Sequence, residues 1–242
     1  MLDYLVPDEI LFLDIETVPQ FPNHDEMNER FKHLWEKKSS TFRKPDESAS
    51  DVYQRAGIYA EFGKIICIST GYLYLNEDEQ HFRLKSYFGD NEKELLQEFA
   101  QMLNNFSKKK NVQLCAHNGK EFDFPYIARR MLINAISLPR VLDIAGKKPW
   151  EVGFIDTMEL WKFGDYKSYT SLDLLSAVFN IPTPKNDIDG SQVATVYYEE
   201  KNLRRIVEYC EKDVITIGQL FLKYKGDALL KPENIESATV FA

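Results

Sequence analysis

The chain has 242 residues, 44% of them hydrophobic and 28% charged, which fits one globular domain and excludes a disordered or fibrous protein. Thirty lysines and arginines against 38 acids give a formal net charge of −8. This balance argues against broad, non-specific binding of duplex nucleic acid, but it is compatible with a nucleic-acid enzyme whose acids hold metal ions.

The first strong pattern is an apolar run at residues 10–13, which predicts a buried strand ending at Asp14-Ile15-Glu16-Thr17. Residues 20–62 are polar and heterogeneous, with helical spacing of apolar residues only within 29–38. Because so long a stretch between two strands is unusual in a compact domain, we interpret residues 20–62 as an insertion into a single domain spanning residues 1–242.

The rest of the chain predicts further strands and then mainly helices. We expect strands at 64–75, 80–88, 112–116 and 154–155, and helices from a cap at Asp90 or Asn91 and then at 124–134, 157–162, 171–180, 191–200 and 203–224. This order favours an α/β fold with a mixed central sheet flanked by helices on both faces. The three cysteines lack a CxxC pair, no apolar run is long enough to span a membrane, and the N-terminus carries acids where a signal peptide needs lysines. We therefore expect a cytoplasmic protein.

Three short patterns carry chemistry. Asp14 and Glu16 stand two apart in a strand, so their side chains share a face. Two carboxylates on a central strand repel each other and lose solvation unless a cation or proton compensates them. A metal site is therefore the favoured interpretation, and a solvated surface pair is the alternative. The pair Asp90-x-Glu92, in contrast, is interpreted as the solvated start of a helix.

The second pattern is the stretch from Asn118 to Tyr126, in which Asp123 is interpreted either as a helix N-cap or as an acid projecting from the sheet edge. The third is Tyr209-x₃-Asp213 on the last helix. Its apolar stripe at 4-3 spacing consists of Leu203, Val207, Cys210, Val214, Ile217, Phe221 and Tyr224. Asp213 lies at the edge of this stripe with Tyr209 one turn before it, which indicates a site, while a buried acid accepting hydrogen bonds is the alternative.

Together the patterns resemble the DEDD superfamily of 3′–5′ exonucleases, which have a ribonuclease H-like fold. The phrases FLDIET and HNGKEFDFPYI look most like the proofreading domain of family B DNA polymerases, and the resemblance covers about residues 8–224. The tyrosine variety is indicated because Tyr209 stands four before Asp213, whereas the histidine variety would need histidine where Glu208 stands. The chain has no room for a polymerase, so it resembles a free-standing exonuclease domain.

The resemblance implies a mechanism and a set of ligands. Asp14, Glu16, Asp123 and Asp213 would hold two Mg²⁺ or Mn²⁺ ions, with Asp14 bridging both. Tyr209 would orient the attacking water, and nucleoside 5′-monophosphates would leave from the 3′ end of single-stranded nucleic acid. The terminal nucleotide would be held by Thr17, Asn118 and Phe122. Proofreading domains act on DNA, so the resemblance favours DNA over RNA and a role in DNA repair.

Two further questions concern substrate and partners. Three basic segments offer contacts to the substrate backbone or bases: Arg129-Arg130, residues 147–150 and residues 162–169. Solvated surface is the favoured interpretation of each. Residues 108–110 follow a predicted helix and are interpreted as stabilising the C-terminal end of its dipole. The alternative function is a catalytically silent module that binds nucleic acid or docks a protein partner through residues 20–62. The intact set of four acids counts against this alternative.

Overall fold

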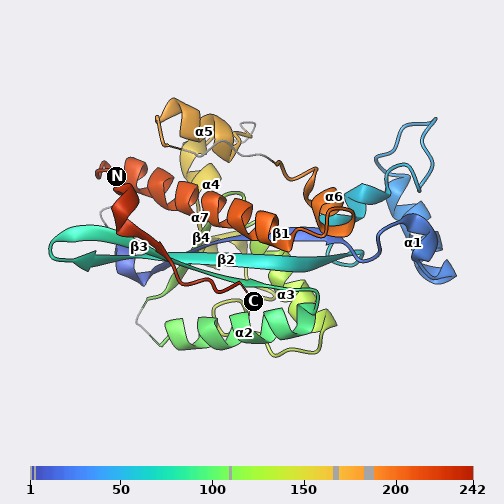
Figure 1. Cartoon of the computed structure of the whole chain (residues 1–242), viewed down its shortest axis with the longest axis horizontal. Helices are drawn as coiled ribbons and strands as arrows, with labels where there is room; N and C mark the ends of the chain where they lie inside the picture. The colour runs from blue at the N-terminus through green and yellow to red at the C-terminus, as the bar shows by residue number, and fades with distance from the viewer. Residues whose placement is uncertain (1, 3, 109–110, 166–168, 183–187, 242) are drawn as a thin grey trace.

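The computed structural model describes residues 2, 4–108, 111–165, 169–182 and 188–241. At its centre lies a six-stranded mixed sheet in the order β5-β4-β1-β2-β3-β6 (Figure 1). β1 (Ile10–Pro19) is antiparallel to β2 (Gly63–Asn76), which is antiparallel to β3 (Glu79–Phe88). β4 (Gln113–Ala116) is parallel to β1, and β5 (Ile155–Asp156) is parallel to β4. β6 (Ile235–Ser237), which the sequence analysis did not predict, is parallel to β3.

Helices cover both faces of this sheet, as predicted. The long α7 (Leu203–Lys225) packs on one face, and α2 (Glu92–Phe106) and α3 (Asp123–Ile133) lie on the other (Figure 1). β1 shows the alternation directly. Leu11, Leu13 and Ile15 belong to the core beneath α2 and α3, whereas Ile10 and Phe12 belong to the core beneath α7. The two cores fix which β1 side chains face which helices.

The local signals place most boundaries close to those expected. α2 begins after Asn91, whose side chain accepts from the Glu94 N–H. The turn between β2 and β3 consists of Glu77 and Asp78, both with positive φ, as a two-residue hairpin turn requires. The remaining helices are α4 (Thr157–Lys162), α5 (Leu172–Val178) and α6 (Val193–Tyr198), with 3₁₀ turns at Pro7–Glu9, His24–Glu26, Tyr53–Ile58, Pro149–Glu151 and Pro232–Asn234.

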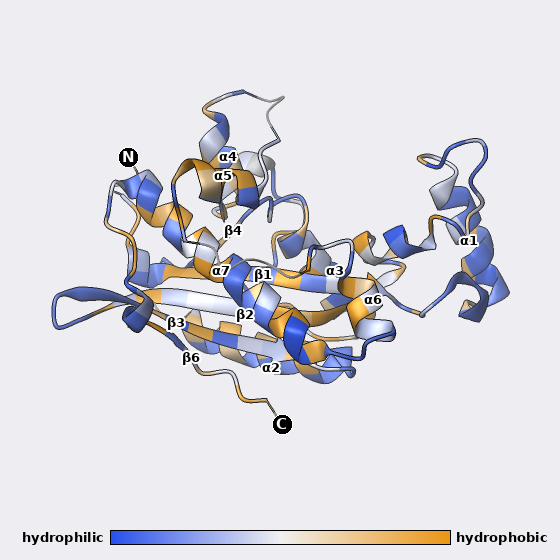
Figure 2. Ribbon diagram, turned by 45° about the horizontal axis from the view of Figure 1, so that its top comes forward, coloured by the Kyte–Doolittle hydropathy of each residue, from blue (hydrophilic) through white to orange (hydrophobic). Residues whose placement is uncertain are grey.

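Residues 20–62 form a lobe at one end of the sheet, to the right in Figure 1. It contains α1 (Glu29–Ser39), which is mainly hydrophilic (Figure 2) and in which only Trp35 and Ser39 are buried. Trp35 is fully buried in a small aromatic core that also contains Tyr53, Phe42 and Tyr59. The 3₁₀ turn Tyr53–Ile58 packs against β1. The lobe therefore has a core of its own beside the first strand.

The interpretation of Asp90-x-Glu92 as solvated surface is wrong for Glu92. Its carboxylate is buried and accepts hydrogen bonds from the Arg130 guanidinium, the Ile65 N–H and the Asn134 amide. Arg130 is buried as well and also donates to the Ala60 carbonyl at 2.8 Å. Arg130 is thus neither solvated nor available to a substrate, because α3 uses it to tie α2, β2 and the end of the lobe together.

Candidate functional site

Asp14 and Glu16 lie in the middle of β1 rather than at its end. The predicted end at residues 14–17 is slightly early, because β1 continues to pair with β2 as far as Pro19. Asp14 is opposite Ser69 and Glu16 is opposite Cys67, with a register shift immediately after Glu16. Both side chains have the parity of Ile10 and Phe12, so they point to the face covered by α7, with Glu16 buried and Asp14 half-buried.

Asp123 approaches β1 from the start of α3. It follows β4 across a short loop and is the first residue of the helix, not its cap, since the N-cap position belongs to Phe122. The cap interpretation is therefore wrong. Asp123 is 3% exposed, and its Oδ1 accepts a hydrogen bond from the N–H of Ile15 at 3.1 Å. Ile15 stands between Asp14 and Glu16, so this bond holds the Asp123 carboxylate against the part of β1 that bears both acids.

α7 contributes Asp213, Tyr209 and Cys210. The Tyr209 hydroxyl hydrogen-bonds to Asp213, one helical turn away, as the spacing predicted. Cys210 belongs to the apolar stripe, yet its thiol lies 3.4 Å from both the carbonyl oxygen and the Oδ2 of Asp14. From the sequence, Cys210 was expected only to pack in the core, because it belongs to the apolar stripe.

The carboxylates are close enough to perturb one another. Burial raises the pKa of Asp14 well above its usual range, and the charges of Asp123, Glu16 and Asp213 raise it further. Burial and then the charge of Asp213 do the same to the pKa of Glu16. Burial also raises the pKa of Asp123 to about 7 and that of Asp213 to about 6. Four acids from three elements therefore share one poorly solvated region, in which the only described cation that offsets their charge is Lys212, whose effect on the pKa of Asp213 is the smallest of those acting on that group.

The donor atoms suit a hard divalent cation. In the described part of the chain, one oxygen of Asp14, one of Glu16 and the Cys210 sulfur lie within 4.8 Å of one another. Asp123 and Asp213 fall outside that compact group and act on it through their charges. Burial raises the pKa of the Cys210 thiol, which donates to Asp14, and a thiol is a poor ligand for a hard cation. The carboxylate oxygens that remain are the ligands Mg²⁺ and Mn²⁺ prefer.

A cavity of about 430 Å³ opens beside Glu16, and two of the three predicted nucleotide-binding residues, Thr17 and Phe122, line it. Asn118 does not. Its N–H donates to Asp156 and its side-chain oxygen accepts from the Tyr169 hydroxyl. The cavity is closed on other sides by residues of the lobe and of the segment that leads into α6.

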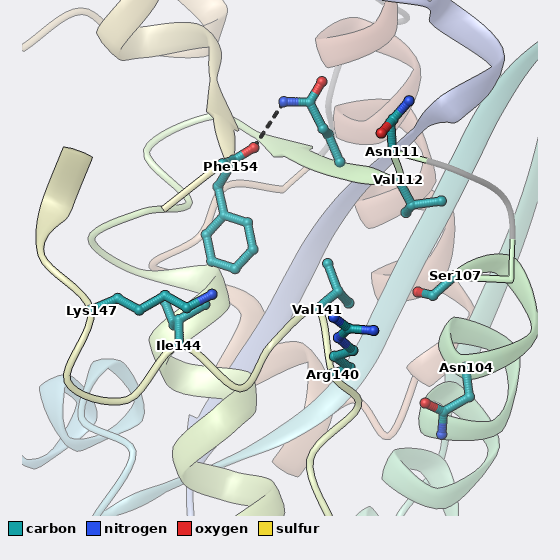
Figure 3. Close-up of a pocket in the computed structure, with 11 residues that line it drawn as sticks. Asn104, Ser107, Asn111, Val112, Arg140, Val141, Ile144, Lys147 and Phe154 are labelled. Carbon is teal, nitrogen blue, oxygen red and sulfur yellow. Dashed lines mark hydrogen bonds between the residues drawn. The ribbon is translucent and has the colours of Figure 1, made fainter. Parts of the chain in front are cut away.

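The basic segments lie elsewhere. Lys147 lines a larger cavity of about 690 Å³ together with Arg140, Asn104 and Phe154 (Figure 3). Phe154 belongs to the core beneath α2 and α3, so this cavity is on the face opposite Asp14. The cavity is also lined by Gln113, the first residue of β4, which pairs with Ile10 of β1. Ile10 lies four residues, or about 13 Å of strand, before Asp14.

Two lysines of the basic segments lie over aromatic rings at the surface. The Lys148 ammonium lies 5.1 Å from the centre of the exposed Trp150 ring, and the Lys162 ammonium lies 5.3 Å from that of Tyr169. Arg129 is exposed. Residues 109–110 and 166–168, which belong to two of the basic segments, lie outside the described residues. None of these side chains lines the cavity beside Glu16.

Comparison with known proteins gives one family and one fold. A family described as "Predicted 3′-5′ exonuclease related to the exonuclease domain of PolB" matches residues 58–236, a range that includes Asp123, Tyr209 and Asp213 but begins after Glu16. A family B DNA polymerase from the hyperthermophilic archaeon Pyrobaculum calidifontis superposes with a TM-score of 0.56 at 13% sequence identity. This match covers 89% of the present chain but only 24% of the polymerase chain.

That superposition identifies the fold as the ribonuclease H-like fold of the polymerase exonuclease domain, as expected from the sequence. The comparison with curated proteins produced no match. None of the helices formed by the described residues is long and apolar enough to cross a membrane.

Proposed function

Since the chain belongs to the family of predicted 3′–5′ exonucleases related to the PolB exonuclease domain, we propose that it is a metal-dependent 3′–5′ exonuclease. It removes 5′-mononucleotides from the 3′ ends of single-stranded nucleic acid, with DNA favoured over RNA, and serves in DNA repair. The observation that carries this proposal is the convergence of Asp14, Glu16, Asp123 and Asp213 on one buried region. A protein that only binds nucleic acid has no use for four acids that raise one another's pKa.

In this proposal the carboxylates of Asp14, Glu16, Asp123 and Asp213 would hold two Mg²⁺ or Mn²⁺ ions. Such ions, when bound, supply Lewis-acid stabilisation of the charge that develops on the phosphate oxygens during an in-line displacement. Neighbouring groups fix two of the ligands, because the N–H of Ile15 orients Asp123 and the thiol of Cys210 orients Asp14.

Tyr209 positions the attacking water. Burial and the neighbouring carboxylates raise its pKa above the ordinary value, so the phenol keeps its proton and donates it in a hydrogen bond to Asp213. The lone pairs of the same oxygen remain able to accept a hydrogen bond from a water molecule. A tyrosine held in this way aligns the water without itself acting as a base.

The cavity beside Glu16 receives the terminal nucleotide. The half-buried Phe122 ring offers an aromatic surface for the base, and Thr17 offers a backbone and hydroxyl contact for the sugar. Asn118 does not line the cavity, and in this proposal it helps to hold the loop that precedes α3 and carries Phe122. We also propose a cytoplasmic location, because Cys67, Cys115 and Cys210 are buried as free thiols.

The alternative is a silent module that docks a partner through residues 20–62. The specific observation in its favour is that the family match begins at residue 58 and so omits Asp14, Glu16 and most of the lobe. A time course on 5′-labelled single-stranded DNA and RNA, with Mg²⁺, Mn²⁺ or EDTA, separates the two functions. A metal-dependent ladder that shortens from the 3′ end and is lost in Asp14→Asn supports the exonuclease.

The matched control for this assay is Glu208→Gln. Glu208 is also an acid of α7, but it is exposed and paired with Arg204. Its substitution leaves the ladder unchanged if the buried acids alone carry activity. A wild-type protein that shortens neither substrate with either metal, and that retains a protein partner through residues 20–62, fits the docking module instead.

A further inference from the structure

The lobe formed by residues 20–62 reaches the cavity beside Glu16. Gln54 and Arg55, from the 3₁₀ turn Tyr53–Ile58, line the same cavity as Glu16, Thr17 and Phe122. The lobe is therefore a wall of the candidate nucleotide site and not only an addition to the end of the sheet. A strand whose 3′ end enters this cavity has to pass the lobe.

Arg55 is the cation of this wall. It is exposed, and no described carboxylate forms an ion pair with its guanidinium. Its nearby partner is instead the Phe42 ring, whose centre lies 4.3 Å from the guanidinium carbon. In a chain of net charge −8, Arg55 lines the same cavity as Glu16 without an ion pair to any described acid, so its guanidinium donors are available to an anionic ligand.

The aromatic core of the lobe holds Arg55 in place. Phe42 is stacked on Tyr59 with ring centres 6.0 Å apart and packs against the fully buried Trp35 at 5.9 Å. An arginine that rests on an anchored aromatic face loses less conformational freedom when it binds. The planar fork of a guanidinium also matches the two non-bridging oxygens of a phosphodiester.

We propose that residues 20–62 form a strand-binding lobe in which Arg55, supported by Gln54, contacts a backbone phosphate of the strand whose 3′ end lies beside Glu16. This inference rests on the proposed function, because it takes the ligand to be a nucleic-acid strand. Arg55 supplies a positive charge on the wall of the cavity that Glu16 also lines, and it acts on binding rather than on the chemical step. The lobe thereby selects single strands that run past Phe42 into the cavity.

The test measures binding and turnover separately on the full chain. Binding of a 5′-fluorescein-labelled single-stranded DNA decamer is titrated in the Asp14→Asn background at several salt concentrations, with and without Arg55→Ala. The loss of one phosphate contact is expected to weaken binding about tenfold and to reduce the slope of log K against log salt by about 0.7. Arg55→Lys is expected to restore the slope but only part of the affinity.

The matched control is Arg140→Ala. Arg140 is also exposed and without an ion pair to any described acid, but it lines the cavity on the opposite face (Figure 3). In turnover assays Arg55→Ala raises KM about tenfold with kcat nearly unchanged, and Arg140→Ala changes neither. Thermal melts of each variant show whether the loss of the Phe42 contact has altered the fold.

The outcomes separate the inference from the function. If the wild type degrades DNA and Arg55→Ala binds as tightly as the parent, or if Arg140→Ala weakens binding equally, the strand-binding role of Arg55 is overturned and the exonuclease stands. If no metal supports degradation but Arg55→Ala alone weakens binding and lowers the salt slope, the phosphate contact stands and the exonuclease fails. A wild type that neither binds nor degrades the decamer overturns both.

Discussion

Arg130→Met removes the cationic half of the buried pair that ties α3 to α2. In the folded protein the Arg130 Nε donates to Glu92 Oε1 at 2.8 Å, and its Nη1 donates to the Ala60 carbonyl at 2.8 Å. After the substitution Glu92 keeps only two donors, the Ile65 N–H at 2.7 Å and the Asn134 amide at 2.9 Å. The carboxylate then remains buried without a compensating charge.

The expected cost follows from that unpaired charge. Removing one partner of a buried ion pair destabilises a protein by about 3–5 kcal/mol. A chain of this size loses about 2–4 °C of Tm for each kcal/mol, so thermal unfolding followed by circular dichroism should show a Tm lower by about 6–20 °C. Arg129→Met is the matched control, because Arg129 is the preceding residue on α3 and is exposed. Its Tm should stay within about 2 °C of the wild type.

A double variant tests the cause. Glu92→Gln with Arg130→Met removes both charges of this buried pair, and the glutamine oxygen can still accept from Ile65. The double variant is therefore expected to be more stable than Arg130→Met alone. A Tm for Arg130→Met equal to that of Arg129→Met, or a double variant less stable than Arg130→Met, would refute the buried pair.

Two further predictions concern the carboxylates and the tyrosine. Burial raises the pKa of Asp123 to about 7 in the folded state, so the stability that its protonated form provides at low pH is lost as the pH rises through that value. The free energy of unfolding of the metal-free wild type should therefore fall by up to about 4 kcal/mol between pH 4 and pH 8. Asp123→Asn avoids this loss, and its Tm advantage over the wild type in EDTA should grow with pH in that window; an advantage that shrinks would contradict the raised pKa. Tyr209→Phe should lower kcat about 10- to 100-fold with KM nearly unchanged, and a variant with wild-type kcat in steady-state assays on single-stranded DNA would exclude Tyr209 as the residue that positions water.

Much of the fold could be predicted because its signals are local. The 4-3 spacing of apolar residues on α7 and the cap at Asn91 depend only on neighbours in sequence, and both elements are found where expected. β1 was predicted to end at residues 14–17, where its apolar run gives way to polar residues, while its pairing with β2 continues to Pro19. β6 has only three residues and is defined by its pairing with β3, which no local pattern reveals.

The candidate site divides in the same way. The shared face of Asp14 and Glu16 follows from strand geometry, and the proximity of Tyr209 to Asp213 follows from helical spacing. The burial of Glu92 could not be predicted, because Arg130 is 38 residues away and pairs with it only after α2 and α3 have packed. The position of Arg55 beside the cavity could likewise not be predicted, because the lobe meets β1 only through tertiary contacts.

The most direct test of the central claim is the identity of the released product. Single-stranded DNA is incubated with the wild-type protein and Mg²⁺ or Mn²⁺ in ¹⁸O-labelled water, and the products are analysed by mass spectrometry. Attack of water at phosphorus by a 3′–5′ exonuclease predicts nucleoside 5′-monophosphates that each carry one ¹⁸O in the phosphate, absent in EDTA and in Asp14→Asn. Nucleoside 3′-monophosphates, internal fragments without mononucleotides, or equal product from Asp14→Asn would contradict the proposed exonuclease.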